Sequence, residues 1–243
     1  MRTSILLGLS FCLAFPGAPA IAQTSSSDGG IRTHIQGIDI PPVANAPFTA
    51  KVVVTWDQPL VGGGTISRKY YTMVARDSHG RVRRETRDFV AAGSSAEPPL
   101  RTFTILDPVG ATRTTCTQAT MTCTTTEFHS RISLAAESED ASSGNERSVH
   151  RINLGEQTLD SLPVKGTRET RSTVAGSNGS DRVVVSHRDL WYSPDLQMDL
   201  SVIRINPQMG QLTLNVTDLV RGEPDSSWLS VPSGYETRNA YVH

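Results

Sequence analysis

The chain has 243 residues and a formal net charge of -1, because 23 Lys and Arg balance 24 Asp and Glu. Binding to nucleic acid or to anionic headgroups by counterion release requires a surplus of cations, so this balance argues against both kinds of partner. The apolar fraction of 37% is typical of a folded protein and not of a disordered chain. Composition therefore indicates one folded domain, or two small ones, and names no reaction.

Residues 1–22 have the layout of a secretory signal peptide. An apolar run at 5–15 is followed by small residues, Ala20 and Ala22, at the -3 and -1 positions before Gln23. A run of about 11 residues is too short to cross a hydrocarbon core of about 30 Å. We expect export to the periplasm or the extracellular space, with cleavage near Ala22/Gln23. No later segment is apolar enough for a transmembrane helix, so we expect none in the mature chain.

Residues 23–47 are rich in Ser, Gly and Pro, which predicts a flexible N-terminal arm. From Phe48 apolar and polar residues alternate with a period of two, which is typical of strands. A single β domain is expected over 48–238, interrupted by an acidic, polar loop at 130–148. About ten strands are predicted, with no long amphipathic helix; in chain order they lie at 48–56, 65–76, 81–89, 102–106, in a cysteine hairpin ending near Phe128, and at 149–159, 162–170, 183–191, 196–202 and 212–217.

A sheet with one apolar face must bury that face, and this chain offers no helices to cover it. The predicted fold is therefore mainly β, with a curved antiparallel sheet that forms a half-barrel or a barrel-like structure. A half-barrel leaves a concave apolar trough, which is the default site for a ligand, whereas a closed barrel or a sandwich fills that space with its own side chains. The expected trough residues come from the first strand and the last hairpin: Val52, Val54, Trp56, Met198, Leu200, Val202, Leu212, Leu214 and Val216.

Two cysteines, Cys116 and Cys123, remain once the signal peptide is removed. The six residues between them can form a hairpin end, so the two thiols can face each other across an antiparallel pair and form a disulfide. Closing so short a loop would stabilise the fold by about 2.5 kcal/mol in the chain-entropy model. Two free thiols are the alternative. A metal site needs about four ligands, which this pair does not supply, so we expect no metal and no cofactor.

Signatures of catalysis are absent from the sequence. None of the six His has the spacing of a zinc protease, and no G-x-S-x-G or S-x-x-K motif is present. His187 is the best single candidate for a general base, but the favoured interpretation is a strand histidine bonded to a neighbour. An arginine stripe is the most visible polar feature, and it is either an anion or partner contact or a solvated face with ion pairs; it contains Arg76, Arg81, Arg83, Arg84 and Arg87.

Several ordered blocks, including Ala75–Glu85, Ile105–Val109, Trp191–Leu196 and Arg221–Pro224, resemble an uncharacterised family of exported bacterial β-rich proteins. The resemblance covers roughly 48–235. More distantly, the order of elements and the ending at Trp228–Tyr235 are similar to the LolA and RseB/MucB lipoprotein-carrier superfamily. That resemblance implies a curved half-barrel that holds acyl chains or senses misplaced lipoprotein.

Three functional hypotheses follow. The first is an exported, non-enzymatic protein that binds a lipid-like or other apolar ligand in the concave face of the sheet. The second is an envelope interaction or sensor protein, which docks a protein partner through a sheet edge or the arginine stripe. The third is a secreted hydrolase with an unrecognised site, which predicts a deep polar pocket with paired titratable groups.

Overall fold

A computed structural model describes residues 37–128, 147–176 and 181–240. The expected signal peptide, residues 23–36 of the expected arm and residues 130–146 of the expected polar loop lie outside the described residues. The described elements are β1 (Phe48–Pro59), β2 (Thr65–Arg76), β3 (Val82–Arg87), β4 (Val90–Ala91), β5 (Leu100–Asp107), β6 (Thr112–Thr117), β7 (Thr122–Glu127), β8 (Arg147–Leu159), β9 (Leu162–Thr173), β10 (Val184–Ser193), β11 (Met198–Asn206), β12 (Gly210–Arg221), the short 3-10 helix η1 (Ser226–Leu229) and β13 (Glu236–Asn239). None of the helical structure in these ranges has the length and hydrophobicity needed to cross a bilayer.

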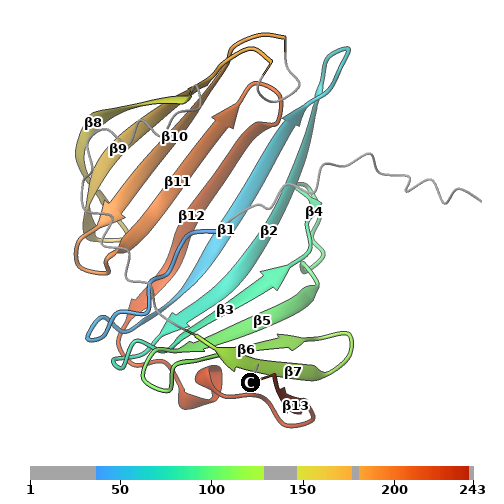
Figure 1. The fold of residues 1–243 in the computed structure, drawn as a ribbon, viewed down its shortest axis with the longest axis vertical. Helices are drawn as coiled ribbons and strands as arrows, with labels where there is room; N and C mark the ends of the chain where they lie inside the picture. Colours follow the sequence, from blue (N-terminus) through green and yellow to red (C-terminus); the bar gives the residue numbers. More distant parts are fainter. Residues whose placement is uncertain (1–36, 129–146, 177–180, 241–243) are drawn as a thin grey trace, which may run out of the picture. The chain divides into compact units, whose positions relative to one another are not determined.

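The strands form one curved sheet in the order β13-β7-β6-β5-β3-β2-β1-β12-β11-β10-β9-β8, with β4 beside β2 (Figure 1). The two ends of this order do not pair, so the sheet is open. A mainly β fold with a curved sheet is thus confirmed, but the sheet has thirteen strands and not about ten. The additional strands, β4 and β13, are two and four residues long, and β13 contains no apolar residue. Neither therefore has the alternation by which strands are recognised in a sequence.

One face of the sheet carries the main core, and we call it the concave face. Partners in neighbouring strands point to the same side, so the register defines this face as a series of rows across the sheet. In one such row Val54 of β1 lies between Tyr70 of β2 and Leu214 of β12, and Leu214 pairs with Val202 of β11. Long alternating strands at the centre of the sheet thus place one continuous apolar surface on this face.

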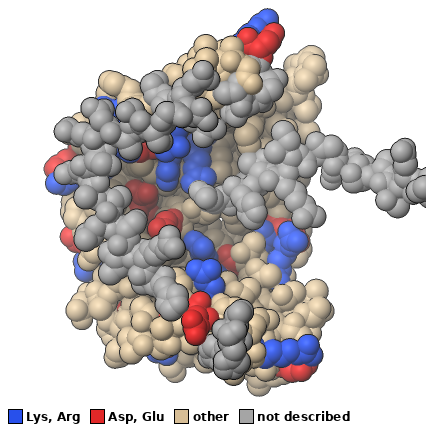
Figure 2. All heavy atoms as spheres, viewed as in Figure 1, with Lys and Arg blue, Asp and Glu red and all other residues tan. Residues whose placement is uncertain are grey.

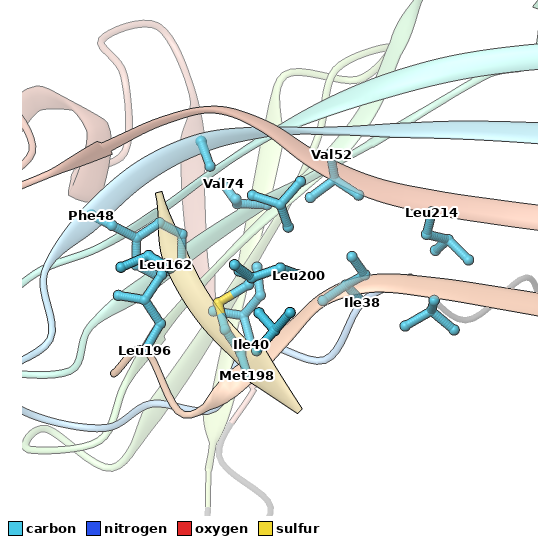
Figure 3. Packing of buried hydrophobic residues seen from close by; sticks show 14 of the residues in the cluster. Ile38, Ile40, Phe48, Val52, Val74, Leu162, Leu196, Met198, Leu200 and Leu214 are labelled. Atoms are coloured by element: carbon cyan, nitrogen blue, oxygen red, sulfur yellow. The ribbon is translucent and has the colours of Figure 1, made fainter. Parts of the chain in front are cut away.

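Residues 37–47, the last part of the expected arm, pack against the concave face. Ile38 and Ile40 are 2% and 3% exposed and belong to the main core, as Figure 3 shows from close by. Arg76 holds this segment in place by donating to the carbonyls of Pro41 and Ala46, each at 2.9 Å. This stretch therefore differs from the expected arm, because two isoleucines spaced by one residue bury their side chains on the sheet.

A second, smaller core lies on the opposite face of the sheet, over β5, β6 and β7. It contains Phe103, Ile105 and the two cysteines, with Tyr235 of the C-terminal segment packed against it. Cys116 and Cys123 are direct register partners with Cα atoms 4.0 Å apart, and the expected disulfide is confirmed. Strand β13 extends this region by pairing with β7 in parallel.

Candidate ligand site on the concave face

The fold brings all nine expected trough residues onto the concave face. Trp56 and Leu212 are register partners and are partly buried against the main core. The other seven are buried in the core: Val52, Val54, Met198, Leu200, Val202, Leu214 and Val216. Their grouping follows from the alternation within β1, β11 and β12, and their part in ligand binding stays a prediction.

Most of the apolar trough is filled by the chain itself. Ile38 and Ile40 turn into the same cluster as Met198 and Leu200 (Figure 3). Arg84 of β3 donates to the carbonyl of Ile38 at 3.3 Å. This bond is a second attachment of the segment to the sheet, in addition to those made by Arg76. An apolar ligand would reach the buried residues only by displacing these two isoleucines.

Beside Ile38 the concave face keeps a hollow of about 370 Å³. Figure 2 shows Lys, Arg, Asp and Glu side chains gathered in the hollowed part of this face. Three arginines from three strands dominate the hollow's lining, which consists of Gly37, Ile38, Asp39, Arg84, Arg188, Asp199, Val202 and Arg204. Because the sheet curves, β3 faces β10 and β11 across this space although five strand-to-strand steps separate β3 from β10 in the sheet.

Arg188 and Arg204 form an unusual pair. They are register partners in β10 and β11, so their side chains leave the same face side by side. Like charges placed directly opposite each other in a sheet destabilise it. On its other side Arg188 pairs with Glu169 of β9, but Arg151 and Arg171 lie 3.0 and 3.5 Å from the carboxylate of Glu169. The hollow therefore concentrates positive charge at this row.

Two further observations concern the cations of the hollow. Nε of Arg188 is buried and has no hydrogen-bond partner among the described residues. Burial, together with the charge of Arg188, lowers the pKa of Arg204. Burial is also the main cause that raises the pKa of the Asp199 carboxyl, although Arg188 and Arg204 oppose the effect. An anion entering the hollow would meet the half-buried guanidinium groups of Arg188 and Arg204 and the exposed one of Arg84.

Tyr70 of β2 interacts electrostatically with an arginine on each side of the hollow. Burial raises the pKa of its phenol, while Arg84 from β3 and Arg204 from β11 both act to lower it. The positive charges of arginines from both sides of the concave face thus act on the pKa of this one phenol. Its ring also packs edge-on against Phe89 with the ring centroids 4.6 Å apart, which adds an aromatic surface next to the charged one.

The arginine stripe does not form one surface. Arg76 is completely buried and Arg83 is buried against the Phe103 ring, 4.1 Å from its centroid. Arg81 and Arg87 are held by carboxylates, at 2.6 Å from Asp77 and 2.9 Å from Glu85 respectively. Arg84 is the member of the stripe that lines the hollow. Alternation along β3 sends neighbouring arginines to opposite faces, so closeness in sequence did not mean a shared contact.

His187 lies away from the hollow. Its Nδ1 is 3.1 Å from Oγ1 of Thr170 in the neighbouring strand, and its register partner in β11 is Ile205. Because residues 187 and 188 point to opposite faces, His187 is on the side away from Arg188. It is a strand histidine bonded to a neighbour, as the second interpretation of its sequence context held. Its place in the sequence pattern makes this residue a candidate, whereas Arg188, Asp199 and Arg204 of the hollow carry no motif.

No protein-family model matches the sequence, and a search of curated proteins finds no match. Among solved structures, MucB in its complex with MucA from Pseudomonas aeruginosa is 13% identical with a TM-score of 0.40, over 78% of this chain and 56% of that chain. LprF from Mycobacterium bovis is 12% identical with a TM-score of 0.31, over 78% and 90%. A LolA superfamily protein from Nitrosomonas europaea is 8% identical with a TM-score of 0.26, over 76% and 90%. These similarities concern the fold alone, and the chain spans little more than half the length of the MucB chain.

Proposed function

We propose that this protein is an exported, non-enzymatic binding protein whose ligand is an amphiphile held on the concave face. The main support for this proposal is that Arg84, Arg188 and Arg204 line one hollow directly beside the apolar core. A guanidinium group binds carboxylate or phosphate through two parallel hydrogen bonds, so three of them favour an anionic head. Val202 and Ile38 in the lining favour an apolar tail next to that head.

The cost of the arginine pair supports a binding role. Two adjacent cations and a buried, unbonded Nε lower the stability of the folded protein. An anion between Arg188 and Arg204 would reduce the repulsion between them and give the buried Nε an acceptor. Both changes would add to the free energy of binding.

The lining also supports binding over catalysis. The described residues that form the hollow include no hydroxyl, thiol or imidazole group, and so no nucleophile of the common hydrolase types. Asp39 and Asp199 are carboxylates of the kind that the hydrolase hypothesis requires. Cationic side chains outnumber these two carboxylates in the lining, which favours holding an anion over pairing acids for proton transfer.

The alternative of a docked protein partner depends on different features. The burial of Arg76 and Arg83 removes the arginine stripe as its basis. The edge strand β8 supports it instead, because β8 pairs with β9 on one side and stands at the end of the strand order. An edge that pairs with no other described strand can accept an added strand from a partner.

The test is a titration of the purified exported protein with palmitate and with hexadecanol, followed by native mass spectrometry. We expect a palmitate complex and weaker binding of the neutral alcohol. The variant Arg188→Gln/Arg204→Gln should lose palmitate binding by about tenfold or more, since each charge-assisted bond is worth roughly 1.5–3 kcal/mol. Arg101→Gln, which removes an exposed arginine, is the matched control. Equal binding of both ligands, or an unaffected double variant, would reject the anionic site.

A further inference from the structure

One end of the sheet carries two projecting hairpins. The register of β1 with β12 ends at the pair Asp57–Gln211, whereas β1 and β2 continue to pair as far as Pro59–Thr65. Likewise β10 begins at Val184, three residues before His187, the first residue that pairs with β11. The β1–β2 and β9–β10 hairpins therefore extend beyond the shorter β11–β12 turn that lies between them (Figure 1, top). We call the described residues 58–66, 174–176 and 181–186 the distal rim.

The distal rim exposes aliphatic side chains at both hairpins. Val61 at the β1–β2 tip is fully exposed and Val183 of the other hairpin is 59% exposed. Four more large aliphatic side chains of the rim are exposed: Leu60, Ile66, Val174 and Val185. A single exposed apolar residue is ordinary on a protein surface, but a group of six at projecting tips indicates a binding surface.

The β1–β2 tip is built to present its side chains outward. Gly62, Gly63 and Gly64 all have positive φ, at 97°, 101° and 87°, and no atom of the other described residues, their chain neighbours apart, lies within 4 Å of where a Cβ would stand on any of them. This backbone turns without packing on anything, so Leu60 and Val61 just before it stand clear of the sheet. A turn evolved for packing alone would gain nothing from leaving these two aliphatic residues in water.

Cations surround these aliphatic tips. Arg68, Arg171 and Arg182 are exposed next to or within the distal rim, and Lys69 is half-buried there. The carboxylates in the same region are Asp57, which accepts a hydrogen bond from Ser67, Asp181, and Glu169, which lies 3.5 Å from Arg171, so four cations stand against three carboxylates. The rim is thus locally cationic although the whole chain has a net charge of -1. The net charge of the whole chain therefore does not exclude an anionic surface as a partner for this end of the sheet.

We propose that the distal rim docks on the surface of an anionic lipid bilayer, with the exposed aliphatic side chains of the rim inserted among the headgroups. Aliphatic tips flanked by arginine and lysine are what an interfacial membrane contact requires, because the side chains enter the apolar boundary while the cations meet lipid phosphates. A protein partner is favoured less, since protein interfaces concentrate aromatic residues in one continuous patch. Here the exposed side chains are aliphatic and sit on two separate projections.

Docking in this orientation would bring the hollow to the lipid surface. Ile205, one residue beyond Arg204, and Val185, three residues before Arg188, already belong to the exposed end of the sheet. A lipid anion would therefore enter the hollow over a short path from the headgroup layer. This part rests on the proposed function, whereas membrane docking itself does not.

The experiment is co-sedimentation of the purified exported protein with vesicles of phosphatidylglycerol and phosphatidylethanolamine, and with vesicles of phosphatidylcholine alone. We expect binding to the anionic vesicles that falls as salt is raised. The variant Leu60→Ser/Val61→Ser should lower the partition coefficient by about tenfold or more, because burying each aliphatic side chain contributes on the order of a tenfold gain. The matched control is Val109→Ser/Val220→Ser, which changes two exposed valines away from the rim.

Failure of sedimentation, equal binding to neutral vesicles, or equal loss in both double variants would overturn the proposal. Thermal unfolding of each variant checks that it is folded, which we expect since all four side chains are exposed. Palmitate binding measured without vesicles reports on the hollow alone. A protein that binds palmitate but no vesicles would refute rim docking and leave the proposed function standing, and the reverse result would do the opposite.

Discussion

The guanidinium of Arg76 in β2 donates from one terminal nitrogen to the carbonyl of Leu196 at 2.7 Å, across 120 positions of sequence. The same side chain binds the carbonyls of Pro41 and Ala46, and its guanidinium lies 5.0 Å from the centroid of the Phe48 ring. Burial lowers the pKa of Arg76 to about 10, so it remains charged at neutral pH. One buried cation thus joins the N-terminal segment, the centre of the sheet and the β10–β11 turn.

Arg76→Met should destabilise the protein by about 3–5 kcal/mol, because three buried carbonyls lose their donor at once. Urea unfolding followed by circular dichroism measures the loss. Arg101→Met, which removes an exposed arginine, should change the free energy of unfolding by less than about 0.5 kcal/mol. A loss below about 1 kcal/mol for Arg76→Met would show that water replaces the guanidinium.

The disulfide should stabilise the second core through the unfolded state. Cys116→Ala/Cys123→Ala should lower the free energy of unfolding by about 2.5 kcal/mol, since the cross-link limits the freedom of the unfolded chain. Dithiothreitol should lower the stability of the natural protein to a similar extent. The double variant is the control, because a reductant that destabilises it equally would be acting elsewhere.

The stability contribution of Asp199 should depend on pH. Burial raises the pKa of its carboxyl above the ordinary 3.8, so over the pH range just above 3.8 the folded state keeps a proton that the unfolded state releases. The free energy of unfolding contributed by this group therefore falls as pH rises through that range.

Asp199→Asn removes this dependence, so its stability gain over the natural protein should grow between pH 4 and pH 7. Urea titrations at four pH values measure the gain. Asp88→Asn, which removes a half-exposed carboxylate, provides the comparison. A gain that shrinks as pH rises would mean that the neighbouring arginines outweigh burial at this site.

Gly210 and Gly64 have the same φ of 87° but different surroundings. A Cβ on Gly210 would clash with the carbonyl oxygen of Asp57, whereas among the described residues no atom beyond the chain neighbours lies within 4 Å of a Cβ on Gly64. Gly64→Ala should cost about 1–2 kcal/mol for the left-handed backbone alone. Gly210→Ala should cost about 1–3 kcal/mol more, because β1 must move. Equal melting temperatures for the two variants would contradict this packing.

Replacing either of the two isoleucines of the N-terminal segment should lower the stability of the protein and open the concave face to ligand. Ile38→Ala and Ile40→Ala should each cost about 2–5 kcal/mol, as buried large-to-small changes do. Where the variants still fold, palmitate should bind more tightly, because the apolar surface beside the hollow is opened. Unchanged palmitate affinity together with the expected loss of stability would confine the ligand to the charged hollow.

Local pattern was sufficient for the strands and the disulfide. The alternation of Val52 and Val54 with polar neighbours, and of Leu212 with Leu214, placed these residues on one face because side-chain direction in a strand has a period of two. Cys116 and Cys123 were recognisable for the same reason, since a short hairpin brings residues on its two arms into register. Strand β13 could not be predicted from the sequence, because Glu236–Asn239 contains no apolar residue.

Tertiary structure decided the site. Arg188 and Arg204 face each other across the β10–β11 hairpin, whose register shifts between Trp191 and Tyr192, and Arg84 meets them only because the sheet curves through several strands. Likewise Ile38 and Ile40 could be assigned to the trough only once the sheet existed to receive them. The sequence by itself determined which residues alternate and therefore which face of each strand is apolar, because that depends on neighbours in the chain. Which charges face one another across the concave surface depends on long-range register and curvature, and these are properties of the whole sheet.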